Sequence, residues 1–266
     1  MPDQDKFAVL RRSRRIWAVA SIHGEADRLR AVHRQLEARF TAGDRLVYLG
    51  NYLGRGSAVI ATIDTLLEFR RRLLARKGMF AYDIAYLRGS QEEMWQKLFQ
   101  LQFAPNPREV YSWMLDHGVG ATIEAYGGNV NTGFANLRDG PLMLTRWTSS
   151  LRAGMQRRAG HYTLMSVVRR AAYTDDRTIL FVHAGIDPER SLSSQGDSLW
   201  WGNSKFASLA EPYEGFARVV RGFDRAHGGV QIGAYTTTID AGSGFGGPLL
   251  AACFDTRSEL VDLIES

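Results

Sequence analysis

Four glycine turns in the sequence carry the polar side chains that could do chemistry. They hold imidazole, guanidinium, amide and hydroxyl groups, and such groups together with turn amides can bind an oxyanion. The second turn follows an apolar run, as happens where a buried parallel strand ends at an active-site turn. It has no carboxylate, thiol or imidazole, so it lacks the usual groups for proton transfer or nucleophilic attack. The turns read SIHG (21–24), GNYLGRG (50–56), RGSQE (88–92) and HAG (183–185).

Apolar runs alternate with helical patterns through the first hundred residues, and this alternation must position the turns. It predicts parallel strands joined by helical crossovers. Sites in such folds lie at the carboxyl ends of the strands, which is where the first three turns fall. We expect strands at 15–21, 45–50 and 80–89, and helices at 26–40, 58–77 and 91–102.

The rest of the chain predicts a second sheet and one weakly patterned connection. Two prolines precede a helix at 108–116, and residues 127–151 show weak periodicity, so they read as an irregular connection or cap. A helix is expected at 161–173 and a strand at 177–185, and the β-branched C-terminal region suggests several short strands. We expect a single domain over residues 1–266.

Composition is that of an ordinary globular protein. Of the 266 residues, 45% are hydrophobic and 23% are charged. The one cysteine, Cys253, lies in an apolar run where packing is its expected role, and no disulfide can form within one chain. Nothing resembles a signal peptide or a membrane span, so we expect a cytoplasmic protein. The net charge of +5 comes from scattered arginines without interleaved aromatics, which disfavours nucleic acid as a partner.

Taken in order, the turns resemble the motifs of the calcineurin-like metallophosphoesterases, especially bacterial phosphoprotein phosphatases and their diadenosine-tetraphosphatase relatives. That family reads GDxHG, GDxxDRG, LRGNHE, HAG and GH, where this sequence reads ASIHG, GNYLGRG, LRGSQE, HAG and RGF. The segments WMLDHGVGATIEAYG, FVHAGIDPERSLSSQGDSLWWG and IDAGSGFGGPL are also similar to family segments. The resemblance covers nearly the whole chain. It implies an α/β fold in which a two-sheet β-sandwich is flanked by helices, in four α/β/β/α layers.

The sequence departs from the family at the residues that do its chemistry. The family binds two divalent metals, such as Mn, Fe or Zn, through carboxylates and imidazoles, with one carboxylate bridging them. Only His23 and His183 match its ligands. We therefore expect a pseudophosphatase, which is a protein of this fold without a metal cofactor and without catalysis. The replaced metal-ligand positions are Ser21, Asn51, Ser90 and Phe223, and the replaced acid pair is Gly54 and Gln91.

The residues that remain suggest a phosphate pocket with Arg88 as its principal donor, because Arg88 matches a family arginine that contacts phosphate. His23, Asn51, His183 and Arg55 are expected beside it. The ligand would be a phosphoprotein or a nucleotide, or the chain would associate with a partner enzyme.

Several alternatives stay open. Arg55 could make structural hydrogen bonds, and a local carboxylate such as Glu92 could pair with Arg88. His227 could replace Phe223 as the last ligand, which would allow a weak phosphoesterase with one metal. Arg221 could fill the vacated metal site or lie in solvent. In a third alternative the pocket is idle and a protein partner docks on residues 127–151.

Overall fold

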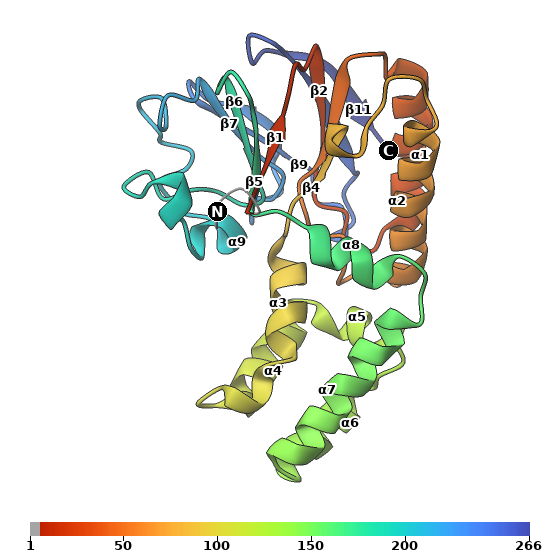
Figure 1. The fold of residues 1–266 in the computed structure, drawn as a ribbon. Coiled ribbons are helices and arrows are strands. Elements are labelled where there is room, and N and C mark those ends of the chain that lie inside the picture. The colour runs from red at the N-terminus through yellow and green to blue at the C-terminus, as the bar shows by residue number, and fades with distance from the viewer. Residues whose placement is uncertain (1–5) are drawn as a thin grey trace.

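The computed structural model of this chain describes residues 6–266 and contains two β-sheets that face each other (Figure 1). Strands β2, β3 and β4 are parallel neighbours, as the sequence predicted, and β10 and β11 extend the sheet in antiparallel pairings. The five-stranded sheet has the order β11 (Leu260–Glu265), β10 (Leu250–Asp255), β2 (Arg15–Val19), β3 (Asp44–Tyr48) and β4 (Ile84–Tyr86).

The second sheet has six strands and mixed pairing. Its central strands β6, β7 and β9 are parallel, whereas β5 and β8 run antiparallel to their neighbours β6 and β9. The edge strand β1 pairs in parallel with β5, so the N-terminal strand belongs to this sheet. The order is β1 (Phe7–Leu10), β5 (Ala171–Thr174), β6 (Ile179–Val182), β7 (Arg218–Arg221), β9 (Thr236–Asp240) and β8 (Gly229–Ile232).

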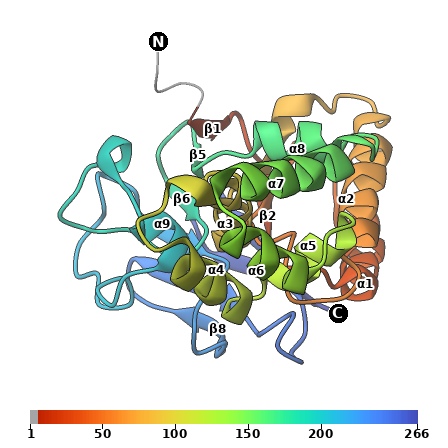
Figure 2. The ribbon, with the colours of Figure 1, turned by 90° about the horizontal axis from the view of Figure 1, so that it is seen from below.

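Helices α1 (Ala26–Arg39) and α2 (Val59–Leu74) lie side by side against the five-stranded sheet (Figures 1 and 2). Their apolar residues recur at helical spacing, so each helix buries one face and exposes its charged residues. The six-stranded sheet is covered instead by residues 186–216, which include η3 (Leu192–Ser194) and α9 (Ser198–Trp201). The predicted two-sheet sandwich flanked by helices is therefore confirmed. The prediction of one domain stays a prediction.

A lobe of helices extends from the strand ends, below the sheets in Figure 1. It begins with α3, which follows the turn after β4, and returns to the sandwich through α8. Its elements are α3 (Ser90–Leu98), η2 (Leu101–Phe103), α4 (Pro107–Asp116), α5 (Val119–Ala125), α6 (Val130–Arg138), α7 (Pro141–Gln156) and α8 (His161–Val167).

The expectation of an irregular connection over residues 127–151 is wrong, because most of this segment is helical. The Asn129 side chain caps α6 by accepting from the amides of Asn131 and Thr132. Pro141 starts α7 at a position where its missing N–H costs nothing. Glycines at 127, 128 and 140 separate these short helices, and they hid the periodicity.

Two other predicted elements have different bounds in the structure. The expected helix at 161–173 ends at Val167, and its last residues form β5 in the six-stranded sheet. The expected strand at 80–89 shortens to β4, preceded by η1 (Ala81–Asp83). No helix among residues 6–266 is both long enough and apolar enough to cross a membrane.

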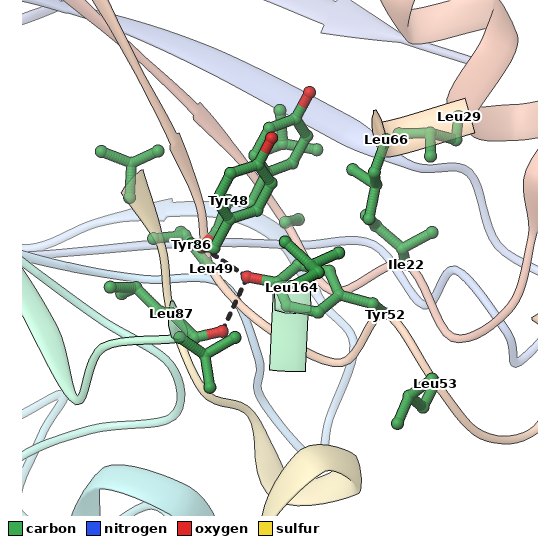
Figure 3. Close-up of a cluster of buried hydrophobic side chains, with 14 of the residues drawn as sticks. Ile22, Leu29, Tyr48, Leu49, Tyr52, Leu53, Leu66, Tyr86, Leu87 and Leu164 are labelled. Atoms are coloured by element: carbon green, nitrogen blue, oxygen red, sulfur yellow. Dashed lines mark hydrogen bonds between the residues drawn. The ribbon is translucent and has the colours of Figure 1, made fainter. Parts of the chain in front are cut away.

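A cluster of tyrosines lies in the core where β3 and β4 end (Figure 3). Tyr48 and Tyr86 stack with ring centroids 5.0 Å apart. The Tyr52 hydroxyl lies 2.6 Å from the carbonyl oxygen of Leu87 and 3.2 Å from that of Tyr48. This hydroxyl therefore links the backbones of two neighbouring strand ends, next to the turns that carry the candidate site.

Candidate functional site

The predicted turns from both sheets meet at one edge of the sandwich. The amides of Ile22 and His23 donate to the Asn51 carbonyl at 3.1 and 2.6 Å, which joins the turns after β2 and β3. The amides of Gly222 and Phe223 both donate to the His183 carbonyl at 3.0 Å, which joins the turns after β6 and β7. Ser21 N donates to Gly222 O at 3.0 Å and connects the two sheets.

The side chain of Glu92 holds the central turns together. Its carboxylate accepts from the amides of Asn51 (2.8 Å), Tyr52 (2.8 Å), Leu53 (3.1 Å) and Gly89 (2.8 Å). Burial raises the pKa of the Glu92 carboxyl, and these four bonds oppose that rise. We call the carboxylate and its four donors the Glu92 cradle. The cradle uses both oxygens of the only carboxylate in this turn, so Glu92 is occupied in shaping backbone.

Gly54 and Gln91, at the positions of the family's acid pair, fit each other closely. Gly54 has a φ of +80°, and a Cβ added there would lie 2.1 Å from Gln91 Oε1. Gln91 in turn donates from Nε2 to the His117 carbonyl at 2.7 Å. A larger residue at position 54 therefore requires Gln91 to move.

The amide of Asn51 lies at the centre of the positions where the resemblance implies metal ligands. Its oxygen accepts from Ser90 Oγ at 3.1 Å and from Gln91 N at 2.9 Å. Its nitrogen donates to His23 Nε2 at 3.1 Å and to Ser21 Oγ at 3.4 Å. We call this set the Asn51 hub. The hub brings five of the sequence-predicted residues into one buried network that needs no ion to link them.

Both matching histidines are buried and neutral. Burial lowers the pKa of His183 to about 4, and it holds the pKa of His23 well below its ordinary value, with further contributions from the neighbouring His183, Arg55 and His227. His183 Nδ1 donates to the Leu49 carbonyl at 2.7 Å, which leaves the lone pair on Nε2. Among the described residues, neither His183 Nε2 nor His23 Nδ1 has a hydrogen-bond partner.

Phe223 lies against these histidines, where the resemblance expected the family's last histidine. Its ring stacks on His183 at 5.3 Å with an interplanar angle of 14°, and it lies 6.0 Å from His23. His227 is close to Phe223, but its Nδ1 is 2.8 Å from Asp240 Oδ2. The apolar ring therefore occupies the space beside the histidines, and His227 has a carboxylate partner of its own.

These donors do not suit two divalent metals. The divalent metals of such sites are held by several carboxylate oxygens or imidazole nitrogens. Here the amide oxygen of Asn51 already accepts two hydrogen bonds, and Glu92 is used by the cradle. Within residues 6–266, no group of three or more His, Cys, Asp or Glu side chains could hold a metal. The arrangement fits a hydrogen-bonded network better than a metal pair.

A pocket of about 230 Å³ opens in front of the hub, and its charge is positive. The Arg55 guanidinium lies 4.1 Å from the centre of the Phe245 ring. Partial burial lowers the pKa of Arg55, and its guanidinium makes no hydrogen bond or ion pair with the described residues. None of the described lining residues is Asp or Glu. They are His23, Arg55, Ser90, Gln91, Met94, His117, Trp201, Phe223, Arg225, His227 and Phe245.

Sequence reasoning missed several of these residues. Arg225, His117 and Phe245 come from three segments that are far apart in the chain, and His117 lies, like Phe245, in a segment similar to the family without being singled out there. Arg225 lies two residues beyond Phe223, and a search for basic residues next to each turn would have found it. Phe245 lies within the segment similar to the family, but nothing in the sequence indicates that its ring faces Arg55.

The structure places Arg88 outside this pocket, which corrects the expectation that it is the principal anion donor there. Its Nη1 is 3.1 Å from Glu93 Oε2, and it lines a separate pocket beside α7 and α8. The anticipated local carboxylate is thus Glu93, because Glu92 is used by the cradle. Arg221 is buried and bonded to Thr238 and Asp224, so it neither fills the metal site nor lies in solvent.

The structure is similar to solved phosphatases. It superposes on a protein described as a candidate diadenosine tetraphosphatase with a TM-score of 0.57, at 15% identity and over 98% of both chains. A protein serine/threonine phosphatase from Saccharomyces cerevisiae superposes with a TM-score of 0.53 at 14% sequence identity, and the match covers 98% of this chain and 84% of that one. A cold-active protein-tyrosine phosphatase from a Shewanella species superposes with a TM-score of 0.53 at 11% sequence identity, and the match covers 100% of this chain and 85% of that one. No family model and no curated protein matches the sequence. At these identities the likeness shows the fold, and it supports the fold that the motifs implied.

Proposed function

We propose that this chain is a non-catalytic protein with the metallophosphoesterase fold, and that it binds a phosphate-type oxyanion without cleaving it. The Asn51 hub is the observation that carries the proposal. In that hub an amide joins Ser21, His23 and Ser90 directly, at the positions where the resemblance implies metal ligands. Because the amide is neutral and fully bonded, it supplies neither a bridging ligand nor a proton for a leaving group.

The positive pocket supports anion binding. Arg55 and Arg225 line it, no described lining residue is acidic, and Arg55 lacks an ion-pair partner among residues 6–266. A guanidinium that is partly buried without a counter-charge is costly, and a phosphate oxygen relieves that cost through a charge-assisted hydrogen bond. Neutral His23 supplies a polar wall without adding charge. The physiological ligand would be a phosphorylated protein or a nucleotide, and a regulatory or binding role follows.

Calorimetry with inorganic phosphate and a phosphoserine peptide tests this proposal. We expect dissociation constants in the micromolar to millimolar range, roughly −8 to −4 kcal/mol. Arg55→Ala should weaken binding about tenfold or more, because a charge-assisted hydrogen bond is lost. Arg88→Ala is the matched control, since Arg88 is paired with Glu93 and faces another pocket, and it should change the affinity less than twofold. No binding by the native protein, or equal weakening by both variants, contradicts the proposal.

A second candidate is a weak phosphoesterase that holds one metal. The unpartnered nitrogens of His23 and His183 favour it, and His227 lies close to the same pocket. Imidazole nitrogens suit Zn²⁺ better than they suit Mg²⁺.

Metal analysis separates the two candidates. The non-catalytic protein, incubated with excess manganese and desalted, should retain well under one ion per chain and hydrolyse p-nitrophenyl phosphate no faster than a buffer blank. Stoichiometric manganese that is lost in His183→Asn, together with hydrolysis above the blank, would establish the hydrolase instead.

A further inference from the structure

A second pocket, of about 680 Å³, lies on another side of the molecule. It is bounded by α2, α8, η1 and the edge strands β1 and β4, and it shares no lining residue with the pocket in front of the Asn51 hub. Figures 1 and 2 both place α8 beside α2, and the contact between His161 Nε2 and Asp64 Oδ1 at 3.0 Å joins these helices. The volume is within the range of roughly 300–1,000 Å³ that is usual for small-molecule pockets.

The walls of this pocket are mostly apolar. Leu67 comes from α2, Ile84 and Tyr86 from β4, and Leu164 and Val167 from α8. Val167 is exposed, whereas Tyr86 and Leu164 are buried in the core cluster of Figure 3. Apolar side chains that line an open pocket stay in contact with water, and covering them with an apolar ligand is favourable. The walls therefore favour a ligand with an alkyl chain or a similar body.

The charges at this pocket have one sign. Arg70, Arg71 and Arg169 line it, and none of its described lining residues is Asp or Glu. The guanidinium groups of Arg70 and Arg71 make no hydrogen bond or ion pair with the described residues. The next residue on α2 behaves differently, because Arg72 Nη1 is 3.0 Å from Glu37 Oε2. Two of three consecutive arginines are thus left for a ligand anion.

We propose that this pocket binds an amphipathic anion, which is an alkyl or acyl chain with a carboxylate or phosphate head group. The chain packs against the walls formed by α2, β4 and α8. The head group accepts hydrogen bonds from Arg70 and Arg71 at the rim, where guanidinium forks match carboxylate and phosphate oxygens. This ligand class satisfies both halves of the pocket, which neither a neutral lipid nor free phosphate does.

Binding can be measured by calorimetry on the full chain with four probes, each below its micelle-forming concentration. The probes are dodecanoate, dodecyl phosphate, dodecanol and inorganic phosphate. Dodecanoate and dodecyl phosphate test the two head groups, dodecanol tests the chain without a charge, and phosphate tests the charge without a chain. We expect both anionic probes to bind at least tenfold more tightly than dodecanol. Inorganic phosphate should not displace dodecanoate.

Three variants locate the site. Arg70→Ala combined with Arg71→Ala should weaken dodecanoate binding about tenfold or more, while the matched control Arg72→Ala stays within twofold. Thr163→Trp, an exposed lining position on α8, should fill the pocket and abolish binding without touching the core. The proposal is overturned if dodecanoate does not bind, if dodecanol binds equally well, or if Arg72→Ala matches the double variant. Unchanged binding in Thr163→Trp overturns it as well. Arg55→Ala should leave dodecanoate binding intact, so failure here is distinct from failure of the proposed function.

Discussion

The Glu92 cradle and the Asn51 hub share the same two turns but are built in different ways. The cradle is a charged carboxylate that accepts four backbone amides and sets the path of the chain. The hub is a neutral amide that bonds to the side chains of Ser21, His23 and Ser90 and to the backbone amide of Gln91, at distances of 2.9 to 3.4 Å. The comparison teaches that the shape of an active-site turn and its chemistry depend on different residues. The path of the backbone and the side chains that it presents can therefore differ independently.

The largest expected effect comes from breaking the cradle. In Glu92→Gln one carboxylate oxygen becomes an NH₂ group that faces two backbone N–H donors. Because those donors are buried, we expect a loss of about 3 kcal/mol or more in the free energy of unfolding. Urea unfolding followed by circular dichroism measures it. Glu93→Gln, at the neighbouring partly buried position, is the control and should cost less than about 1 kcal/mol. Equal losses in the two variants would show that Glu92 is not the organising group.

A second prediction uses the buried histidines beside the hub. His183 has a pKa of about 4 in the folded chain, whereas its unfolded value is near 6.5. The unfolded chain therefore binds more protons between these values, so stability falls as the pH decreases from about 6.5 towards 4. At pH 5 we expect His183 alone to account for roughly 2 kcal/mol of that loss. Urea titrations of chelator-treated protein at pH 7 and pH 5 should show a smaller pH-dependent loss in His183→Asn, and equal losses would refute the assignment.

A third prediction concerns the fit between Gly54 and Gln91. Gly54→Ala places a methyl group against the Gln91 side chain and requires a positive φ, so we expect a loss of about 1.5 kcal/mol. In Gly54→Ala combined with Gln91→Ala the contact is absent. In the Gln91→Ala background, Gly54→Ala should therefore cost only the strain of a positive φ at an alanine, which is about 1 kcal/mol or less. A double-mutant cycle without coupling would mean that the two residues do not constrain each other.

The smallest effects should come from the hub itself. Ser90→Ala removes a hydrogen bond of 3.1 Å to Asn51 and should cost about 1 kcal/mol. Ser21→Ala removes a longer hydrogen bond to Asn51, of 3.4 Å, which is close to the greatest distance at which such a bond forms. It should cost about half as much or less. Thermal unfolding of both variants beside the native protein checks the order. If either hub variant lowers the free energy of unfolding as much as Glu92→Gln does, the proposed difference between the cradle and the hub is wrong.

The sequence predicted the turns better than it predicted where their side chains point. Strand–turn–helix periodicity located β2, β3 and β4, and the turn motifs brought Ser21, Asn51, Ser90 and Phe223 to one place, because local backbone geometry follows from glycine spacing. Arg88 was misplaced because a long side chain can turn either way from its Cα. Its direction here follows from Glu93, one helical turn along α3.

The helical lobe and the pocket lining were harder to predict for a different reason. Helix α6 has only nine residues, and glycines interrupt the segment before α6 and between α6 and α7, so no single helical pattern runs through it. The stability of both helices depends on buried residues such as Trp147 and Leu151. The pairing of Arg55 with Phe245 joins residues 190 positions apart, and only the packed structure determines it.

The Glu92 cradle also has a consequence for the timing of local motions. The amide hydrogens of Asn51, Tyr52, Leu53 and Gly89 all point to one carboxylate, although they belong to turns after two different strands. When that carboxylate moves away, all four lose their acceptor together. Their exchange with solvent deuterium should therefore follow a single opening reaction with one free energy, and the slowest-exchanging loop amides should lie at the mouth of the candidate site.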